Sequence, residues 1–405
     1  MWRLPIAGAH RVAGSAGEFV FVGGAGDFDS RGLIRRKGDF AAQLQGAMEN
    51  LATALAIESA ALRDVVRLKV FYKSDGQRDE WDVLAALAKH FDVAPLPAIS
   101  LIPCPLQPFA GQEIQIQAIA IRNWRDGADI RVAAEESPLR YRASFGPRKV
   151  TRGLRAGEFI AVASRAACDD DGNCLAADNG VEQSRIIMSS HDAVLRALGA
   201  TFQDCVKMEG YYFGNTLGQW AEMAKMRASF FREPGPVATV VPAHVLSPPG
   251  AVTKIEVMAM RERWNGFDKY IPREDRWPRR VWDWPVPLPY RQAIRLRDTI
   301  WLGGQVPYAT HSNAGRTALA GELHPQTQFT MTYIDDLLHA FGRSPSDLQL
   351  MVGYFTSGGS ENETRAFLDT VAETVPGALP PITVVPQPHM HTDEMMVEIW
   401  GVSRG

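Results

Sequence analysis

The stretch "IWLGGQVPYATHSNAG" at residues 300–315 ends an apolar run with a glycine pair, and "VFVGGAGDFDSRG" at residues 20–32 does the same. The two pairs begin 280 residues apart, at Gly23 and Gly303, and Ala163 in "FIAVASRAACDDDGN" lies halfway between them. A fixed spacing of 140 residues indicates an internal repeat, which must then be visible in other parts of the chain.

Further features recur in the same order in all three copies. An amphipathic helical pattern follows each run, at residues 39–58, 183–199 and 329–342. An aspartate then opens a β-rich segment, at Asp64, Asp204 and Asp347. A second helical pattern and two strand patterns complete each copy, and the last strand ends in arginine. The order predicted for each copy is strand–strand–helix–strand–helix–strand–strand.

This order predicts an α+β fold of three tandem domains, each a mixed sheet with two helices on one face. We place the domains at residues 1–122, 141–261 and 286–405, with connectors at 123–140 and 262–285. The second connector region contains four tryptophans, which favour burial, so we expect it to pack along the domain interfaces. The tryptophans are Trp264, Trp277, Trp282 and Trp284. Stacking on a nucleic acid is the less favoured alternative.

Composition narrows the classes of function. The chain has 405 residues, of which 46% are hydrophobic and 22% charged, and its formal net charge is −3. No uniform basic field is available for nucleic acid, and the apolar runs are too short to cross a membrane. The N-terminus lacks the apolar core of a signal peptide, and the four cysteines show no CxxC spacing. We therefore expect a cytoplasmic protein with reduced thiols.

The opening of the third copy, "PYRQAIRLRDTIWLGGQVP" at residues 289–307, resembles the RidA family, also called the YjgF or endoribonuclease L-PSP superfamily. The resemblance lies in the Pro-Tyr-x-Gln-Ala start and the Gly-Gln-x-Pro turn. In the first copy, "AMENLATAL" (47–55) and "IQIQAIAIR" (114–122) are also similar to that family. The resemblance implies a chorismate-mutase-like fold and trimers with a small-molecule cleft at each interface. Three copies in one chain would then form an intramolecular pseudo-trimer. Whether two such rings form a homodimer stays open.

The resemblance also implies site residues. Imine-hydrolysing members hold the substrate carboxylate with an arginine, and its counterparts here are Ile99, Ala238 and Ile382. The missing arginine argues against the hydrolysis of 2-imino acids. Arg165, which takes the place of Gln305 after the glycine turn, is the candidate replacement, with a surface ion pair as the alternative.

A family glutamate on the last strand orients a water molecule, and we place its counterparts at Gln117, Glu256 and Glu398. Glu398 and Glu256 are the predicted catalytic bases, because a partly buried carboxylate can accept a proton from water. Solvated or ion-paired structural carboxylates are the alternatives. Tyr290 matches a family tyrosine and is expected to orient the substrate.

The glycine turns complete the predicted binding sites. Backbone amides of Gly303 and Gly304, and of Gly23 and Gly24, are expected to hold a ligand oxygen, with Gln305 and Ile382 lining the cleft. His389 and His391 share a strand face if that segment is extended, yet Pro-Gln-Pro before them favours a loop. We expect no metal and no cofactor.

The leading hypothesis is a hydrolase of a C–N bond in a small metabolite, an enamine or imine first and an amide next. A non-catalytic metabolite-binding or regulatory protein is the first alternative, because the family arginine is missing. A chorismatase-like hydrolase is the second, and it would need cations for two carboxylates. Ribonuclease activity has no basic patch to support it.

Overall fold

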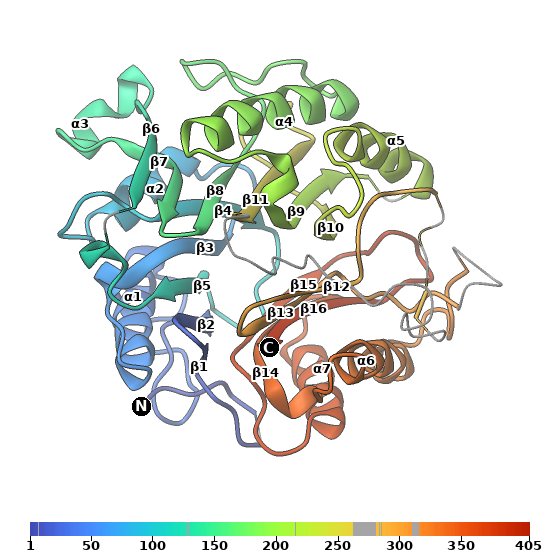
Figure 1. The fold of residues 1–405 in the computed structure, drawn as a ribbon. Helices are drawn as coiled ribbons and strands as arrows, with labels where there is room; N and C mark the ends of the chain where they lie inside the picture. Colours follow the sequence, from blue (N-terminus) through green and yellow to red (C-terminus); the bar gives the residue numbers. More distant parts are fainter. Residues whose placement is uncertain are drawn as a thin grey trace.

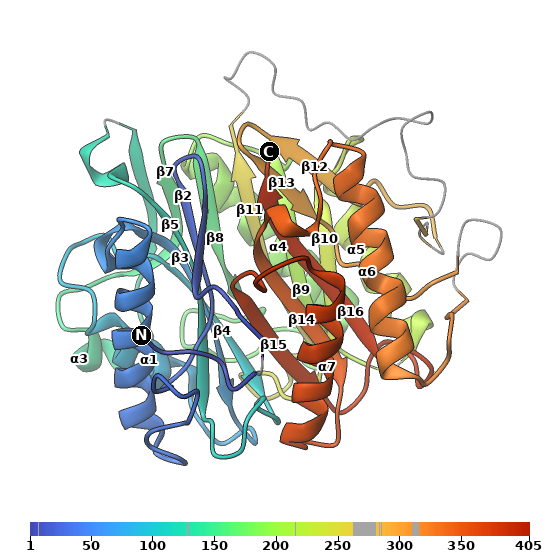
Figure 2. The ribbon, with the colours of Figure 1, turned by 90° about the horizontal axis from the view of Figure 1, so that it is seen from below.

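The structure is a computed structural model that describes residues 1–405 except 7, 128, 215, 262–280, 283, 285 and 310–315. Three sheets lie around a common centre with the long helices outside them (Figure 1). Seen from below, α1 and the α6–α7 pair cover opposite flanks of the molecule (Figure 2). Within the described residues, no helix combines the length and apolar character needed to cross a membrane.

Each copy of the repeat contributes the predicted order of elements. The first domain contains β1 (Ala13–Ala16), β2 (Phe19–Ala25), α1 (Phe40–Ile57), β3 (Val65–Lys73), α2 (Glu80–Ala88), β4 (Ala98–Cys104) and β5 (Ile114–Ile121). The second contains β7 (Val150–Ala156), β8 (Phe159–Arg165), α4 (Gly180–Ala197), β9 (Cys205–Phe213), α5 (Leu217–Ala228), β10 (Val237–Ala243) and β11 (Thr253–Met260). The third contains β12 (Ala293–Leu296), β13 (Thr299–Leu302), α6 (Leu323–His339), β14 (Leu348–Thr356), α7 (Glu361–Thr374), β15 (Ile382–Gln387) and β16 (Val397–Arg404). Short 3-10 turns precede the central strands, at Leu62–Asp64, Phe202–Asp204 and Pro345–Asp347.

The three sheets share one topology. Their strand orders are β1-β2-β5-β3-β4, β7-β8-β11-β9-β10 with β6 added beside β7, and β12-β13-β16-β14-β15. In each sheet the last two strands of the order, such as β3 and β4, pair in parallel, and the other pairs are antiparallel. The predicted fold class of three mixed sheets in an α+β pseudo-trimer is therefore confirmed.

The first connector contains more structure than its polar sequence indicated. Residues 123–140 hold two 3-10 turns, Trp124–Asp126 and Leu139–Tyr141, and the strand β6 (Ile130–Glu135). β6 pairs antiparallel with β7 and extends the second sheet to six strands. A short helix, α3 (Arg142–Phe145), follows it. Ile130 and Val132 alternate with polar residues, which suits an edge strand, but their run is too short to stand out from a loop.

Equivalent aromatic residues of the three central strands meet at the centre of the ring. Phe71 of β3 and Tyr211 of β9 each pack edge-on against Tyr354 of β14, with ring centroids 6.4 Å apart. The hydroxyl groups of Tyr211 and Tyr354 are 2.9 Å apart and hydrogen-bonded. Phe71, the third aromatic residue, has no hydroxyl group, so the two buried hydroxyl groups bond to each other.

A balanced group of buried charges joins the first two domains. Arg67 and Lys69 of β3 face Glu209 of β9 and Glu256 of β11. Arg67 lies 2.8 Å from Glu209 and 3.0 Å from Glu256, and the Ser100 hydroxyl donates to Glu256 at 2.8 Å. Burial alone would raise the pKa of Glu256, but the two cations outweigh it and hold the pKa at about 2. Glu256 is therefore ionised and held by Arg67, Lys69 and Ser100.

The substitution Glu256→Gln tests this group. It leaves two buried cations with one carboxylate, and we expect the free energy of unfolding to fall by about 3 kcal/mol at pH 7. Because the folded-state pKa of Glu256 is depressed, its contribution is present above the unfolded-state pKa of about 4.3 and is lost as the pH falls toward 2. Urea unfolding should therefore show a difference from wild type that shrinks between pH 5 and pH 3. Glu222→Gln, at an exposed pair with Lys225, is the control and should change stability by less than about 0.5 kcal/mol. Equal stability of Glu256→Gln and the control would contradict this account.

Candidate functional site

The strand ladders show which residues are equivalent at the three contacts between domains, here named seam 1/2, seam 1/3 and seam 2/3. Phe71, Tyr211 and Tyr354 are opposite Gln115, Lys254 and Glu398, respectively, in the ladders. The counterparts of Glu398 are therefore Gln115 and Lys254.

This register corrects the sequence-based alignment of the family glutamate. Gln117 and Glu256 are level with Trp400, two residues further along the strand. A shift of two residues leaves a side chain on the same face of a strand, so the hydrophobic pattern could not reveal the error. By the same ladders, Ala25, Arg165 and Gln305 are equivalent, which confirms the predicted relation between Arg165 and Gln305.

Seam 1/3 is closed by hydrogen bonds between side chains and main chain and by the close approach of Gly23 to the neighbouring main chain. Gln115 donates from Nε2 to the carbonyl oxygen of Val384 at 2.7 Å. The amide of Gly24 donates to Thr383 Oγ1 at 3.0 Å, and a Cβ on Gly23 would lie 2.7 Å from the backbone nitrogen of Ile382. Gly23, Gly24 and Ile382, predicted to bind a ligand, thus contact one another across this seam.

Seam 1/2 is closed by ion pairs. Lys254 donates from Nζ to the carbonyl oxygen of Leu101 at 2.7 Å and pairs with Glu80 of α2 at 2.6 Å. Arg165 pairs with Glu135 of β6 at 2.6 Å and donates to the carbonyl oxygen of Ile99 at 3.0 Å. Its charge is already compensated, and it lies in a different seam from Glu398.

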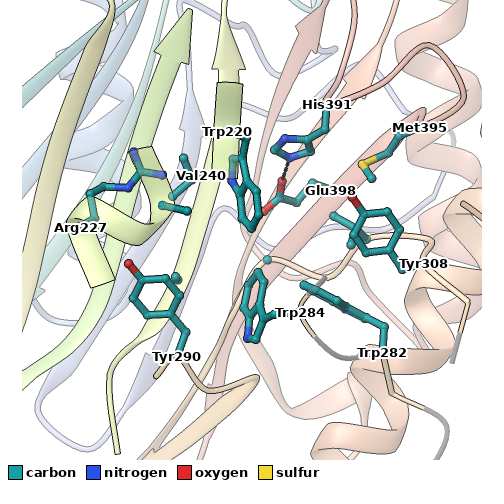
Figure 3. Close-up of a pocket in the computed structure, with 14 residues that line it drawn as sticks. Trp220, Arg227, Val240, Trp282, Trp284, Tyr290, Tyr308, His391, Met395 and Glu398 are labelled. Carbon is teal, nitrogen blue, oxygen red and sulfur yellow. Dashed lines mark hydrogen bonds and ion pairs between the residues drawn. The ribbon is translucent and has the colours of Figure 1, made fainter. Parts of the chain in front are cut away.

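Seam 2/3 contains a pocket instead. The centre of a water-sized sphere has about 30 Å³ of room in it, and all the space between the atoms, open solvent at the mouth included, is about 470 Å³. It is lined by Trp220, Ala224 and Arg227 of α5, Ala238 and Val240 of β10, Trp282 and Trp284 of the connector, and Tyr290, Gly304, Val306, Tyr308, His391, Met395 and Glu398 of the third domain (Figure 3). Val240 occupies the position of Leu101 and Val384 in the closed seams. In the two closed seams, the side chain of Gln115 or Lys254 donates a hydrogen bond to the carbonyl oxygen at this position. Glu398 is the equivalent side chain in seam 2/3, and its carboxylate can only accept hydrogen bonds.

His391 orients the carboxylate of Glu398. Its Nε2 lies 2.8 Å from Glu398 Oε2, and its Nδ1 lies 3.0 Å from the hydroxyl of Tyr212. Because the carboxylate needs a donor, the proton belongs on Nε2, and Nδ1 accepts from Tyr212. The sequence suggested His389 and His391 as a possible pair, but the structure separates them. The His389 ring packs against His244, with centroids 4.2 Å apart.

The pocket wall includes five tryptophan and tyrosine rings. Trp284 lies nearly parallel to Trp220 and edge-on to Trp282 and Tyr290. Trp282 is 1% exposed, and its Nε1 donates to Gln305 Oε1 at 3.1 Å. The expectation that the connector packs at an interface is confirmed for Trp282, while Trp264 and Trp277 lie outside the described residues. Gln305 acts on the pocket by holding Trp282.

Arg227 was missed by sequence reasoning. It is 1% exposed, and its Nε and Nη1 have no hydrogen-bond partner among the described residues. Burial lowers its pKa, which the nearby Tyr290 and Tyr212 partly offset. Arg227 lies seven residues after Trp220, on the buried face of α5. An arginine in register with an apolar helical stripe was the signal that could have found it.

The predicted role of the glycine amides is wrong. The amide of Gly303 donates to the carbonyl oxygen of Gln292 at 2.7 Å, and that of Gly304 to Ala238 at 2.8 Å. Neither is available to a ligand oxygen. Gly304 provides space instead, because a Cβ there would overlap Glu398 Oε1. Among the predicted residues, the structure brings Glu398, Tyr290 and Gly304 together in one pocket.

The substitution Gly304→Ala should displace the Glu398 carboxylate and break its bond to His391. We expect the free energy of unfolding to fall by about 1–3 kcal/mol, as for other overpacked sites. Gly218→Ala in α5 is the matched control, because a Cβ there would meet nothing within 4 Å. A Gly304→Ala protein of wild-type stability, whose crystal structure retains the 2.8 Å bond, would refute this role of Gly304.

Comparison with known proteins assigns most of the first two domains to a family. The endoribonuclease L-PSP family model matches residues 4–122 and 148–261, which together are more than half of the chain. Residues 286–405 lie outside both matches but repeat the same strand order.

The solved structure of one chorismatase agrees with the fold over most of the chain, and single-domain proteins match parts of it. A chorismatase is similar with a TM-score of 0.57 at 12% identity, over 84% of this chain and 93% of that chain. A YjgF-family protein of Mycobacterium tuberculosis is 24% identical over 32% of this chain and all of its own, with a TM-score of 0.26. RidA from the Antarctic bacterium Psychrobacter sp. is 15% identical over 31% of this chain and 94% of its own, with a TM-score of 0.26. With the matched segments covering its first two domains, the chain belongs to the endoribonuclease L-PSP family.

Proposed function

We propose that the pocket of seam 2/3 binds a small organic molecule and hydrolyses a C–N bond in it, with Glu398 as general base. The observation that carries this proposal is the buried carboxylate of Glu398 in a walled pocket, held by His391 at 2.8 Å. A base must be fixed and shielded from bulk water to direct one water molecule at an electrophilic carbon.

The proposed reaction is a hydrolysis in which water is the nucleophile. Glu398 takes a proton from the water as its oxygen bonds to the carbon of a C=N or amide group. For an imine, the proton passes from Glu398 to the nitrogen to give a carbinolamine; Glu398 then takes the proton of the new hydroxyl group and passes it to the nitrogen as the C–N bond breaks, the C=O bond forms and ammonia or an amine leaves. For an amide, the single proton passes from Glu398 to the nitrogen as the tetrahedral intermediate collapses to the carboxylic acid and the amine. Glu398 is ionised again at the end of the cycle. Imines or enamines are the first substrates to test, and ring or linear amides are the next.

Tyr290 has a supporting role in this proposal. Burial raises the pKa of its hydroxyl above the usual value, although Arg227 opposes the shift, so the phenol keeps its proton. A protonated phenol at the pocket wall can donate to an oxygen or nitrogen of the substrate. For Glu256 and Arg165, the ion pairs described above support structural roles in seam 1/2 rather than catalytic ones.

The substitution Glu398→Gln is the direct test. It keeps the shape of the side chain and removes the base, so we expect the release of ammonia or amine to fall at least about 100-fold with little change in ligand affinity. The assay uses a panel of imines generated in solution, lactams and linear amides. The exposed Glu394→Gln is the control and should retain wild-type turnover. Wild-type turnover by Glu398→Gln would reject the proposed base.

A metabolite-binding protein without catalysis is the rival from another class. It is favoured by the absence of the family arginine at Ile99, Ala238 and Ile382 and by the occupied amides of Gly303 and Gly304. Ligands from the panel that raise the melting temperature while no product forms would support it.

A chorismatase-like hydrolysis is a further candidate, because the fold of a chorismatase matches 84% of this chain. A substrate with two carboxylates needs two cations, and the described lining of the pocket supplies one, Arg227. Chorismate therefore belongs in the panel.

A further inference from the structure

Arg227 is a buried cation without a counterion in the described part of the chain. No carboxylate there lies within the 4.0 Å of an ion pair, and two of its three guanidinium nitrogens have no hydrogen-bond partner. An uncompensated buried charge is costly to the folded protein. Because Arg227 lines the pocket, an anion entering the pocket could supply the missing charge.

The pocket also restricts which anion fits. Glu398 contributes a negative charge to the same space, and Arg227 is the one cationic side chain in the described lining. A dianion such as a phosphate monoester would be left with an unbalanced charge beside Glu398. A single carboxylate matches the guanidinium in charge and in hydrogen bonding.

The remaining walls define the body of the ligand. Trp220, Trp282, Trp284 and Tyr308 surround the space with ring faces and edges, and such walls favour a flat, apolar body. Figure 3 shows Arg227 and Tyr290 on one side of the pocket and Glu398 with His391 on the other. A ligand held by Arg227 would therefore extend its far end toward Glu398.

We infer that the substrate is a small cyclic or aromatic monocarboxylate, anchored by Arg227 with its reacting group turned toward Glu398. The claim that the reacting group faces Glu398 rests on the proposed function. The claim that Arg227 anchors the carboxylate can be tested by measuring binding alone. The anchoring cation belongs to helix α5, not to the strand position occupied by Ala238 in this seam.

Calorimetric titration of the full chain with benzoate and with benzamide tests the anchor. The two probes have the same flat body and differ in charge. We expect wild type to bind benzoate at least tenfold more tightly than benzamide. Arg227→Met should weaken benzoate binding at least tenfold and leave benzamide unchanged, and Arg227→Lys should give an intermediate affinity. Lys225→Met, at an exposed position of the same helix, should bind benzoate as wild type does.

A melting curve separates loss of binding from loss of folding. Because no carboxylate of the described residues compensates Arg227 in the free protein, Arg227→Met should melt at the wild-type temperature or above it. The inference is overturned if wild type does not bind benzoate, if benzamide binds equally well, or if Arg227→Met keeps wild-type affinity. Arg227-dependent binding without turnover of any panel member would leave the anchor standing and refute the hydrolase. Turnover of carboxylate-bearing panel members at the wild-type rate by Arg227→Met would leave the hydrolase standing and refute the anchor.

Discussion

One strand position in each domain decides whether the adjoining seam closes. A side chain from the last strand of one domain faces a carbonyl oxygen on the neighbouring domain, and Gln115 and Lys254 donate to it at 2.7 Å. Glu398 occupies the third position and cannot donate. The carboxylate turns to His391 instead, and a pocket remains between the domains. The choice of donor or acceptor at one position thus distinguishes three seams formed by sheets with equivalent strand orders.

The buried charges also differ between the closed seam 1/2 and the open seam 2/3. In seam 1/2 the buried cations Arg67 and Lys69 are balanced by Glu209 and Glu256, so the charges hold two domains together. In seam 2/3 the opposite charges of Arg227 and Glu398 line a shared space without forming an ion pair. Balanced buried charges join two domains in seam 1/2, whereas we propose that the separated charges of seam 2/3 serve a ligand lying between them. A tripled chain can hold both arrangements because its seams differ in sequence, which identical subunits cannot do.

The repeat and its fold could be predicted from the sequence because they depend on features with a fixed period. The glycine runs, the helical stripes and the aspartates before the central strands all recur at similar spacing. The candidate site was predicted only in part. Glu398 and Tyr290 were identified. The residues of the other two domains that were aligned with Glu398 were two positions out of register, and such an error leaves a side chain on the same face of its strand. Arg227 and His391 come from a helix and a loop that only tertiary packing brings to the pocket.

A crystal structure of the protein with benzoate tests the central claim most directly. The account predicts one benzoate per chain, between α5, β10 and β16, with its carboxylate about 2.7–3.2 Å from the Arg227 guanidinium and its ring against the tryptophans. Benzoate bound beside Gln115 or Lys254, or held in seam 2/3 with its carboxylate turned away from Arg227, would contradict it.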